Sequence, residues 1–177
     1  MVQLWLKALP ARDLFELARE AVAACRQRDA LLVVNDRPDV ARAAGADGVH
    51  LGQEDLPAAA AREVLGADAL IGVSTHSDAE IDAAIAAGAD YLGFGPVFET
   101  GSKPGAPLPS PHGLAGLERA VRRAAPVPLV AIGGLTAGTA AAVARAGAAC
   151  AASIGEICHA ADPESAARSL AEAFARG

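Results

Sequence analysis

The sequence predicts an α/β fold, specifically a TIM-type (β/α)8 parallel barrel that lacks its first βα unit. Short aliphatic runs alternate with alanine-rich stretches along the chain. Gly-Ala-Asp also recurs at Gly45, Gly66 and Gly88, each time closing an alanine-rich stretch before an apolar run. A spacing of about 21 residues holds one strand, one helix and two loops, which is a βα unit with a parallel neighbour. We expect a single domain over residues 1–177.

The apolar runs that follow these glycines are short enough to be buried strands. A glycine just past a helix can adopt the left-handed conformation at little steric cost, which lets the chain turn into the next strand. The expected strands are Val2–Leu6, Leu31–Asn35, Gly48–Leu51, Leu70–Ser74, Tyr91–Phe94, Leu129–Ile132 and Cys150–Ile154.

Helices should occupy most of the gaps between these strands. We expect Asp13 to begin the first helix, because Asp is a good N-cap and an apolar stripe with helical spacing follows it. Pro163 should begin the last helix, because proline suits a first helical turn. Residues 95–112 form the long irregular segment of the chain, which predicts a functional loop.

Seven alternating units fit a parallel barrel better than an open sheet, although a closed barrel has eight. The missing strand would lie before Met1. Either the chain is truncated at its N-terminus relative to a full barrel, or a partner or an irregular segment covers the gap, because an uncovered parallel edge is exposed to pairing with other chains. The sequence leaves open whether the chain forms a homo-oligomer.

Composition excludes several classes of protein. An apolar content of 53% in 177 residues predicts a packed core rather than disorder. A net charge of −6 offers no basic stripe for nucleic acid. We expect no membrane span, because no apolar run approaches about 20 residues, and no signal peptide, so the expected location is cytoplasmic. The three cysteines show no zinc-ligand spacing and are expected to be reduced.

Two acids follow neighbouring predicted strands. Asp36 ends Val33-Val34-Asn35-Asp36, and Asp55 comes nineteen residues later, after Gly48-Val49-His50-Leu51. Mg²⁺ is usually held by one or two carboxylates while substrate phosphates fill other positions, so this pair predicts a magnesium site in a phosphate-handling enzyme. Either acid could instead simply cap a helix, since Pro38 and Pro57 lie close behind them.

Other polar residues after the strands resemble the inventory of a phosphate site. Gly133-Gly134 follows the sixth expected strand and Gly155 follows the seventh, at the barrel end where phosphate is often bound. Glycines let backbone N–H groups approach an anion, and two adjacent loops can surround one phosphate. A tight turn without any ligand is the alternative for Gly133-Gly134.

The combined motifs resemble thiamine phosphate synthase and its paralogue, the thiazole tautomerase. The resemblance runs in order across nearly the whole chain and includes Val34-Asn35-Asp36-Arg37, Gly45-Ala46-Asp47-Gly48-Val49-His50-Leu51-Gly52-Gln53, Ile71-Gly72-Val73-Ser74-Thr75-His76-Ser77 and Ala131-Ile132-Gly133-Gly134. It implies an enzyme that joins hydroxymethylpyrimidine diphosphate to thiazole phosphate with release of diphosphate. The implied partners are therefore small-molecule substrates.

The resemblance also implies roles for individual residues. Asp36 and Asp55 match the ligands of Mg²⁺. Ser74, His76 and Lys103 are the implied catalytic residues. Substrate contacts are implied for Gln3, Lys7, Asn35, Ser74 and Lys103 on the pyrimidine diphosphate, and for Thr100, Ser102, Gly133, Gly134 and Gly155 on the thiazole phosphate.

One departure from the family pattern bears on activity. The family's Gln-Leu-Arg-Glu-Lys reads Gln3-Leu4-Trp5-Leu6-Lys7, so Trp5 replaces an arginine that would face the diphosphate. Two other functions remain open. A tautomerase would use His76 as a proton shuttle without metal, and a noncatalytic module would bind thiazole or thiamine phosphate without turnover; Asp55 favours the synthase.

Overall fold

The computed structural model describes residues 1–101 and 110–177. The chain forms two compact units, each built from parallel strands and the helices that follow them. The first unit contains Met1–Ser74 and Ala84–Tyr91, and the second contains Thr75–Ala83 and Leu92–Gly177.

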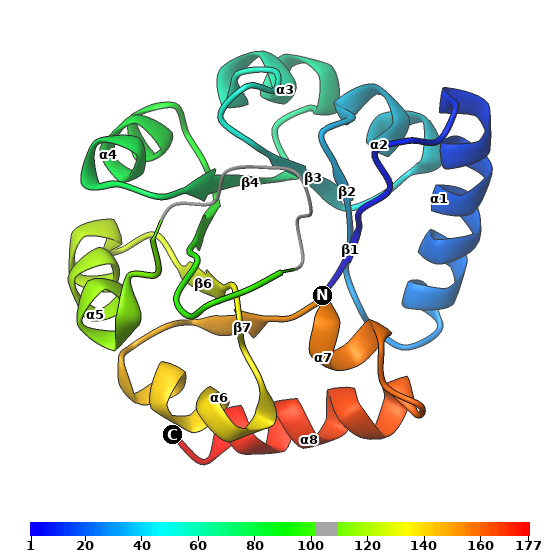
Figure 1. Ribbon diagram of the computed structural model, residues 1–177. Coiled ribbons are helices and arrows are strands. Elements are labelled where there is room, and N and C mark those ends of the chain that lie inside the picture. Colours follow the sequence, from blue (N-terminus) through cyan, green and yellow to red (C-terminus); the bar gives the residue numbers. More distant parts are fainter. Residues whose placement is uncertain (102–109) are drawn as a thin grey trace. The chain divides into compact units, whose positions relative to one another are not determined.

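The strands of the first unit are β1 (Val2–Leu4), β2 (Leu32–Asn35), β3 (Gly48–Leu51) and β4 (Leu70–Thr75), and its helices are α1 (Ala11–Arg26), α2 (Pro38–Ala44) and α3 (Ala58–Leu65). Neighbouring strands pair in parallel, and Asn35 lies opposite His50 in the β2–β3 register. The helices lie along one side of these strands (Figure 1).

The second unit contains β5 (Tyr91–Phe94) except for Tyr91 itself, which belongs to the first unit, together with β6 (Leu129–Ile132) and β7 (Cys150–Ala152). These strands also pair in parallel. Helix α4 (Asp78–Ala86) precedes β5, and the remaining helices are α5 (Gly113–Ala124), α6 (Ala137–Arg145), α7 (Gly155–Cys158) and α8 (Pro163–Ala175). Helix α8 packs beside α6 through Ala140, Leu170 and Ala173 (Figure 1).

All seven expected strands are present in the described residues. Five of them match to within one residue at each end, while β1 and β7 end two residues earlier than expected, at Leu4 and Ala152. Strands buried on both faces read as continuous apolar runs, which is why they could be located from the sequence.

The Gly-Ala-Asp repeat has a physical cause. Gly45 ends α2 with φ of 71°, a left-handed conformation that favours glycine. The carboxylate two residues later then turns back to the preceding strand, where Asp47 accepts from the Leu32 N–H at 2.7 Å. Asp90 does the same for the Ile71 N–H at 2.7 Å. The repeat therefore ends a helix and fixes the start of a strand in one step.

Two helix starts test the sequence analysis. Asp13 does not begin α1, which starts at Ala11 with Pro10 as its N-cap; Asp13 lies within the first turn instead. An acid there still interacts favourably with the helix dipole. Pro163 does begin α8, and the Asp162 side chain caps it by accepting from the Ser165 N–H at 3.1 Å.

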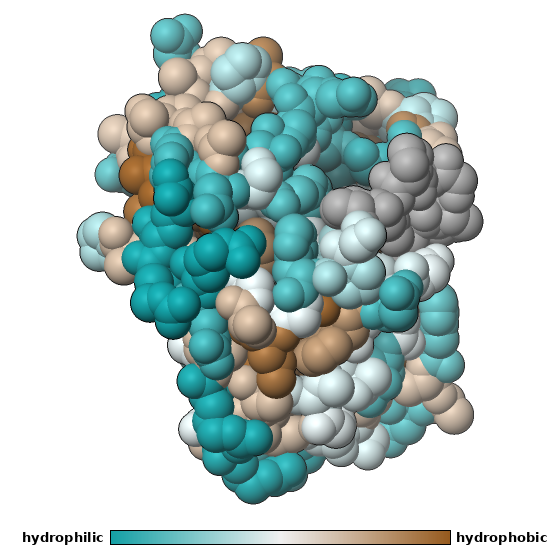
Figure 2. Space-filling model, turned by 60° about the vertical axis from the view of Figure 1, so that its left-hand side comes forward, coloured by the Kyte–Doolittle hydropathy of each residue, from teal (hydrophilic) through white to brown (hydrophobic). Residues whose placement is uncertain are grey.

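Charged residues link α4 and α5 on the surface of the second unit. Arg123 forms a bidentate pair with Asp82, and Arg119 bonds Asp78 at 3.3 Å. Figure 2 brings this side of the protein forward, and hydrophilic residues cover much of it. No helix in the described part of the chain is long and apolar enough to cross a membrane.

Candidate active site

Two carboxylates come together at the ends of β2 and β3. Asp36 follows β2 directly and has φ of 63°, a conformation that few residues other than glycine adopt. Asp55 is held by the loop after β3, where its Oδ2 accepts from the Gly52 N–H at 2.6 Å. Burial raises the pKa of Asp36 above its ordinary value of 3.8, and a hydrogen bond with the Asp55 carboxyl raises it further. The two side chains therefore face each other.

One cation accompanies this pair of acids. The Lys7 ammonium lies 2.9 Å from Asp36 Oδ2, and this contact raises the pKa of Lys7. Among the residues that the structure describes, Lys7 is the cation in contact with this pair of carboxyl groups. Among the described residues no group of three or more His, Cys, Asp or Glu could hold a metal ion, so any cation bound here must take its other ligands from water or substrate.

The helix-cap alternative does not explain either acid. Arg37 is the N-cap of α2 and Pro57 is the N-cap of α3, and neither helix has a side-chain cap. Asp36 and Asp55 are therefore available for another role.

A row of polar side chains lies beside the carboxylates in the first unit. The Gln3 amide donates to Asn35 Oδ1 at 2.7 Å. Buried His50 connects two hydroxyl groups, with Nε2 at 2.9 Å from Ser74 Oγ and Nδ1 at 3.0 Å from the Tyr91 hydroxyl. Burial keeps the Tyr91 phenol protonated by raising its pKa above the ordinary value of 10. The hydrogen bond with His50 therefore fixes the position of the Ser74 hydroxyl group.

Glycine at position 72 makes room for this arrangement. A Cβ there would lie only 2.0 Å from Tyr91 Cζ, far inside van der Waals contact. The Tyr91 ring can reach His50 because β4 carries no side chain at that point.

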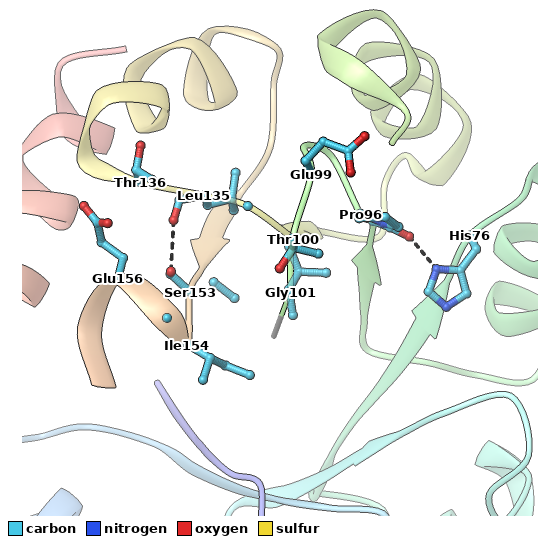
Figure 3. A pocket seen from close by; sticks show the side chains of 16 residues that line it. His76, Pro96, Glu99, Thr100, Gly101, Leu135, Thr136, Ser153, Ile154 and Glu156 are labelled. Atoms are coloured by element: carbon cyan, nitrogen blue, oxygen red, sulfur yellow. Dashed lines mark hydrogen bonds between the residues drawn. The ribbon is translucent and has the colours of Figure 1, made fainter. Parts of the chain in front are cut away.

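A pocket of about 300 Å³ lies in the second unit (Figure 3). The segments that line it follow β4, β5, β6 and β7, namely His76, 95–96, 99–101, 132–136 and 152–156. Gly133 and Gly134 have φ of 94° and 67°, and a Cβ on either would collide with Pro96 or with the Glu99 carbonyl. These glycines therefore allow two loops to approach each other around the pocket.

Several polar groups of the pocket are already hydrogen-bonded. The Ser153 hydroxyl donates to the Leu135 carbonyl at 3.0 Å, and His76 Nδ1 donates to the Gly95 carbonyl (Figure 3). The Glu156 carboxylate accepts from the Ala137 N–H at 3.1 Å, at the start of α6. The described lining contains two glutamates, Glu99 and Glu156, and no lysine or arginine.

The structure groups the residues expected from the sequence into two sets. Gln3, Lys7, Asn35, Asp36, Asp55 and Ser74 lie in the first unit, and His76, Thr100, Gly133, Gly134 and Gly155 line the pocket of the second. Ser102 and Lys103 lie outside the described residues.

The sequence analysis did not single out three residues that the geometry brings forward. His50 lies inside β3 and not after it, Tyr91 begins β5, and Glu156 contacts a backbone group nineteen residues away. An apolar strand that contains a histidine was the available signal for His50, because a buried imidazole needs polar partners.

The family model and the curated relatives point to one family. The family model for thiamine monophosphate synthase matches residues 1–157. The chain is 51% identical over 176 residues to the thiamine-phosphate synthase of Anaeromyxobacter dehalogenans, covering 99% of the chain and 78% of that protein. It is 48% identical over 175 residues to the thiamine-phosphate synthase of Moorella thermoacetica, covering 99% of the chain and 82% of that protein.

A solved structure gives the same result for the fold. The thiamine phosphate pyrophosphorylase from Pyrococcus furiosus superimposes with a TM-score of 0.88 at 36% identity, covering 98% of this chain and 81% of that one. The expected α/β fold of TIM type is thereby confirmed.

Proposed function

The chain belongs to the thiamine monophosphate synthase family, and from this premise we infer how its two sets of residues serve the family reaction. The enzyme transfers the hydroxymethylpyrimidine group from its diphosphate to thiazole phosphate, releasing diphosphate and forming thiamine phosphate. The observation that carries the assignment to this chain is the pair of facing carboxylates at Asp36 and Asp55, with Lys7 beside them.

We assign Mg²⁺ to this pair. Burial and the neighbouring Asp55 carboxyl raise the pKa of Asp36 although Lys7 acts in the opposite direction, and a bound cation would offset both effects. Carboxylate oxygens are the ligands that Mg²⁺ prefers, and diphosphate oxygens and water can complete its octahedron. A bound Mg²⁺ would offset the charge that develops on the departing diphosphate.

The neighbouring side chains are assigned to the pyrimidine diphosphate. The Lys7 ammonium can exchange part of its contact with Asp36 for a diphosphate oxygen. The Gln3 and Asn35 amides, already joined at 2.7 Å, offer their remaining donors and acceptors to the pyrimidine. If Tyr91 donates to His50 Nδ1, then His50 Nε2–H donates to Ser74 Oγ, and the Ser74 hydroxyl hydrogen can point to the substrate.

The pocket of the second unit is assigned to thiazole phosphate. Its volume suits a small heterocycle, and Thr100, Gly133, Gly134 and Gly155 are the family's phosphate-site positions that line it. Lys103 is proposed to contribute a positive charge. In the proposed reaction the pyrimidine CH₂–O bond breaks first, both electrons leave with the diphosphate, and the thiazole nitrogen then donates its lone pair to the resulting cation.

Diphosphate release tests this function. The enzyme is supplied with both substrates, with and without Mg²⁺, and with thiazole phosphate omitted. We expect diphosphate and thiamine phosphate to form together in equal amounts, and only when the metal and both substrates are present. If the protein bound both substrates but formed no product, it would instead be a noncatalytic binding module.

One observation supports the tautomerase as a second candidate. His76 lines the pocket and holds the Gly95 carbonyl through Nδ1, which leaves Nε2 as the proton-accepting nitrogen of the neutral ring. A thiazole carboxylate phosphate offered without pyrimidine distinguishes the two reactions. Tautomer conversion that a chelator does not affect would favour the isomerase.

A further inference from the structure

Glu156 occupies a place where a phosphate would be expected to bind. Its carboxylate lines the pocket and accepts the N–H of Ala137, the first residue of α6. The N-terminal N–H groups of a helix are its natural anion-binding groups. The protein therefore places its own anion on the helix end that faces the proposed thiazole phosphate pocket.

Two other amide groups in the first turn of α6 are also hydrogen-bonded. The N–H groups of Thr139 and Ala140 donate to the Thr136 carbonyl at 3.1 and 3.0 Å. The Thr136 N–H donates to the Thr139 hydroxyl at 3.0 Å. A phosphate that takes the Ala137 N–H must therefore displace the Glu156 carboxylate from it.

Charge adds to this competition. A phosphate monoester carries close to two negative charges at pH 7, and carboxylates within a few ångströms of it repel it. Glu156 is half-buried on the pocket wall, whereas Glu99 lies at an exposed position on the same lining (Figure 3). Of these two acids, Glu156 is the one that accepts a hydrogen bond from an amide group of the helix end.

We propose that Glu156 is a specificity-determining residue that weakens the binding of phosphorylated thiazole relative to the unphosphorylated thiazole alcohol. The carboxylate competes with the phosphate group for the start of α6 and repels it, while the alcohol meets neither penalty. This inference rests on the proposed thiazole phosphate pocket.

The test compares Glu156→Gln with the wild type. Glutamine keeps the shape and can still accept from Ala137, but the amide is neutral and competes less well. KM is measured for thiazole phosphate and for thiazole alcohol, and inorganic phosphate is tested as an inhibitor. We expect KM for thiazole phosphate and the inhibition constant of phosphate to fall about tenfold, with KM for the alcohol changing less than about twofold.

Two further variants make the test specific. Glu164→Gln removes the same charge from α8, where Glu164 pairs with Arg168, and should change neither constant. Glu99→Gln removes a charge from the lining without touching the helix end, and should give a clearly smaller gain than Glu156→Gln.

Three results would overturn the inference. Thiazole phosphate could bind equally well or more weakly in Glu156→Gln, Glu99→Gln could give an equal gain, or both thiazole ligands could gain alike. If instead no protein, wild type included, turned over thiazole phosphate or bound phosphate, the proposed function would fail and this inference with it.

Discussion

The Lys7 ammonium lies 2.9 Å from Asp36 Oδ2, while the other neighbour of that carboxyl is the acid Asp55. One cation between two carboxyl groups leaves an excess of negative charge, and burial makes that excess costly. A divalent cation would remove it, and its open coordination positions would face the substrate.

Asp55→Asn should separate chemistry from thiazole binding. The amide removes one charge from the proposed metal site, and we expect turnover to fall on the order of 10²-fold or more. Affinity for thiazole phosphate should stay within about twofold, because that ligand is assigned to the other unit. Steady-state kinetics and calorimetric titration measure the two quantities. Asp39→Asn is the matched control, since Asp39 is an exposed acid that pairs with Arg37.

Equal loss of turnover and of thiazole phosphate binding in Asp55→Asn would refute the assignment of the metal and the thiazole phosphate to different units.

Tyr91→Phe should weaken catalysis through Ser74 without a direct substrate contact. The change removes the hydroxyl that holds His50 Nδ1 at 3.0 Å and keeps the ring. We expect kcat to fall roughly tenfold through loss of the ordered Ser74 hydroxyl, with KM for thiazole phosphate unchanged. A variant that loses thermal stability but keeps kcat would assign Tyr91 to packing alone.

Trp5→Arg should raise activity. An arginine at this position would restore a guanidinium to a developing anion, and such a charge-assisted contact corresponds to on the order of 10-fold to 10²-fold in kcat/KM. Trp5→Gln serves as the control that removes the indole without adding charge. A gain of equal size in both variants would show that the indole obstructs the site and that the charge adds nothing.

His112→Phe should reduce the loss of stability in acid. Burial lowers the pKa of His112, and the charges of nearby His76 and Arg119 lower it further, while Glu80 opposes them. The folded state therefore favours the neutral ring, so this contribution is complete above the ordinary pKa of 6.5 and is lost as pH falls through the lowered value. Phenylalanine keeps the contact with Phe94, whose ring centroid is 4.6 Å away. Thermal unfolding from about pH 7.5 to pH 5 should show a shallower decline for the variant; parallel declines would contradict the assignment.

Most of the strands could be predicted because they are short, largely apolar runs followed by polar residues. The first helix does not begin at Asp13, as the N-cap preference of Asp predicts. Pro10 takes the N-cap position instead, and the helix begins at Ala11. Local patterns thus located the elements better than their first residues.

Only part of the candidate site could be predicted from the sequence. Asp36 and Asp55 could be found because both follow strands, and the carboxyl ends of parallel strands meet at one edge. The role of Glu156 depends on the Ala137 N–H, which belongs to another helix. No sequence pattern connects those two positions, so their contact appears only when the chain is folded.

Asp36 and Asp55 are proposed to hold a divalent cation together against the diphosphate. A crystal structure with Mn²⁺ in place of Mg²⁺ and with diphosphate measures this directly through the anomalous signal of manganese. We predict one peak within about 2.5 Å of an oxygen from each aspartate, with diphosphate oxygens completing the coordination. Manganese bound to diphosphate alone, with the two aspartates turned away from it, would contradict the claim.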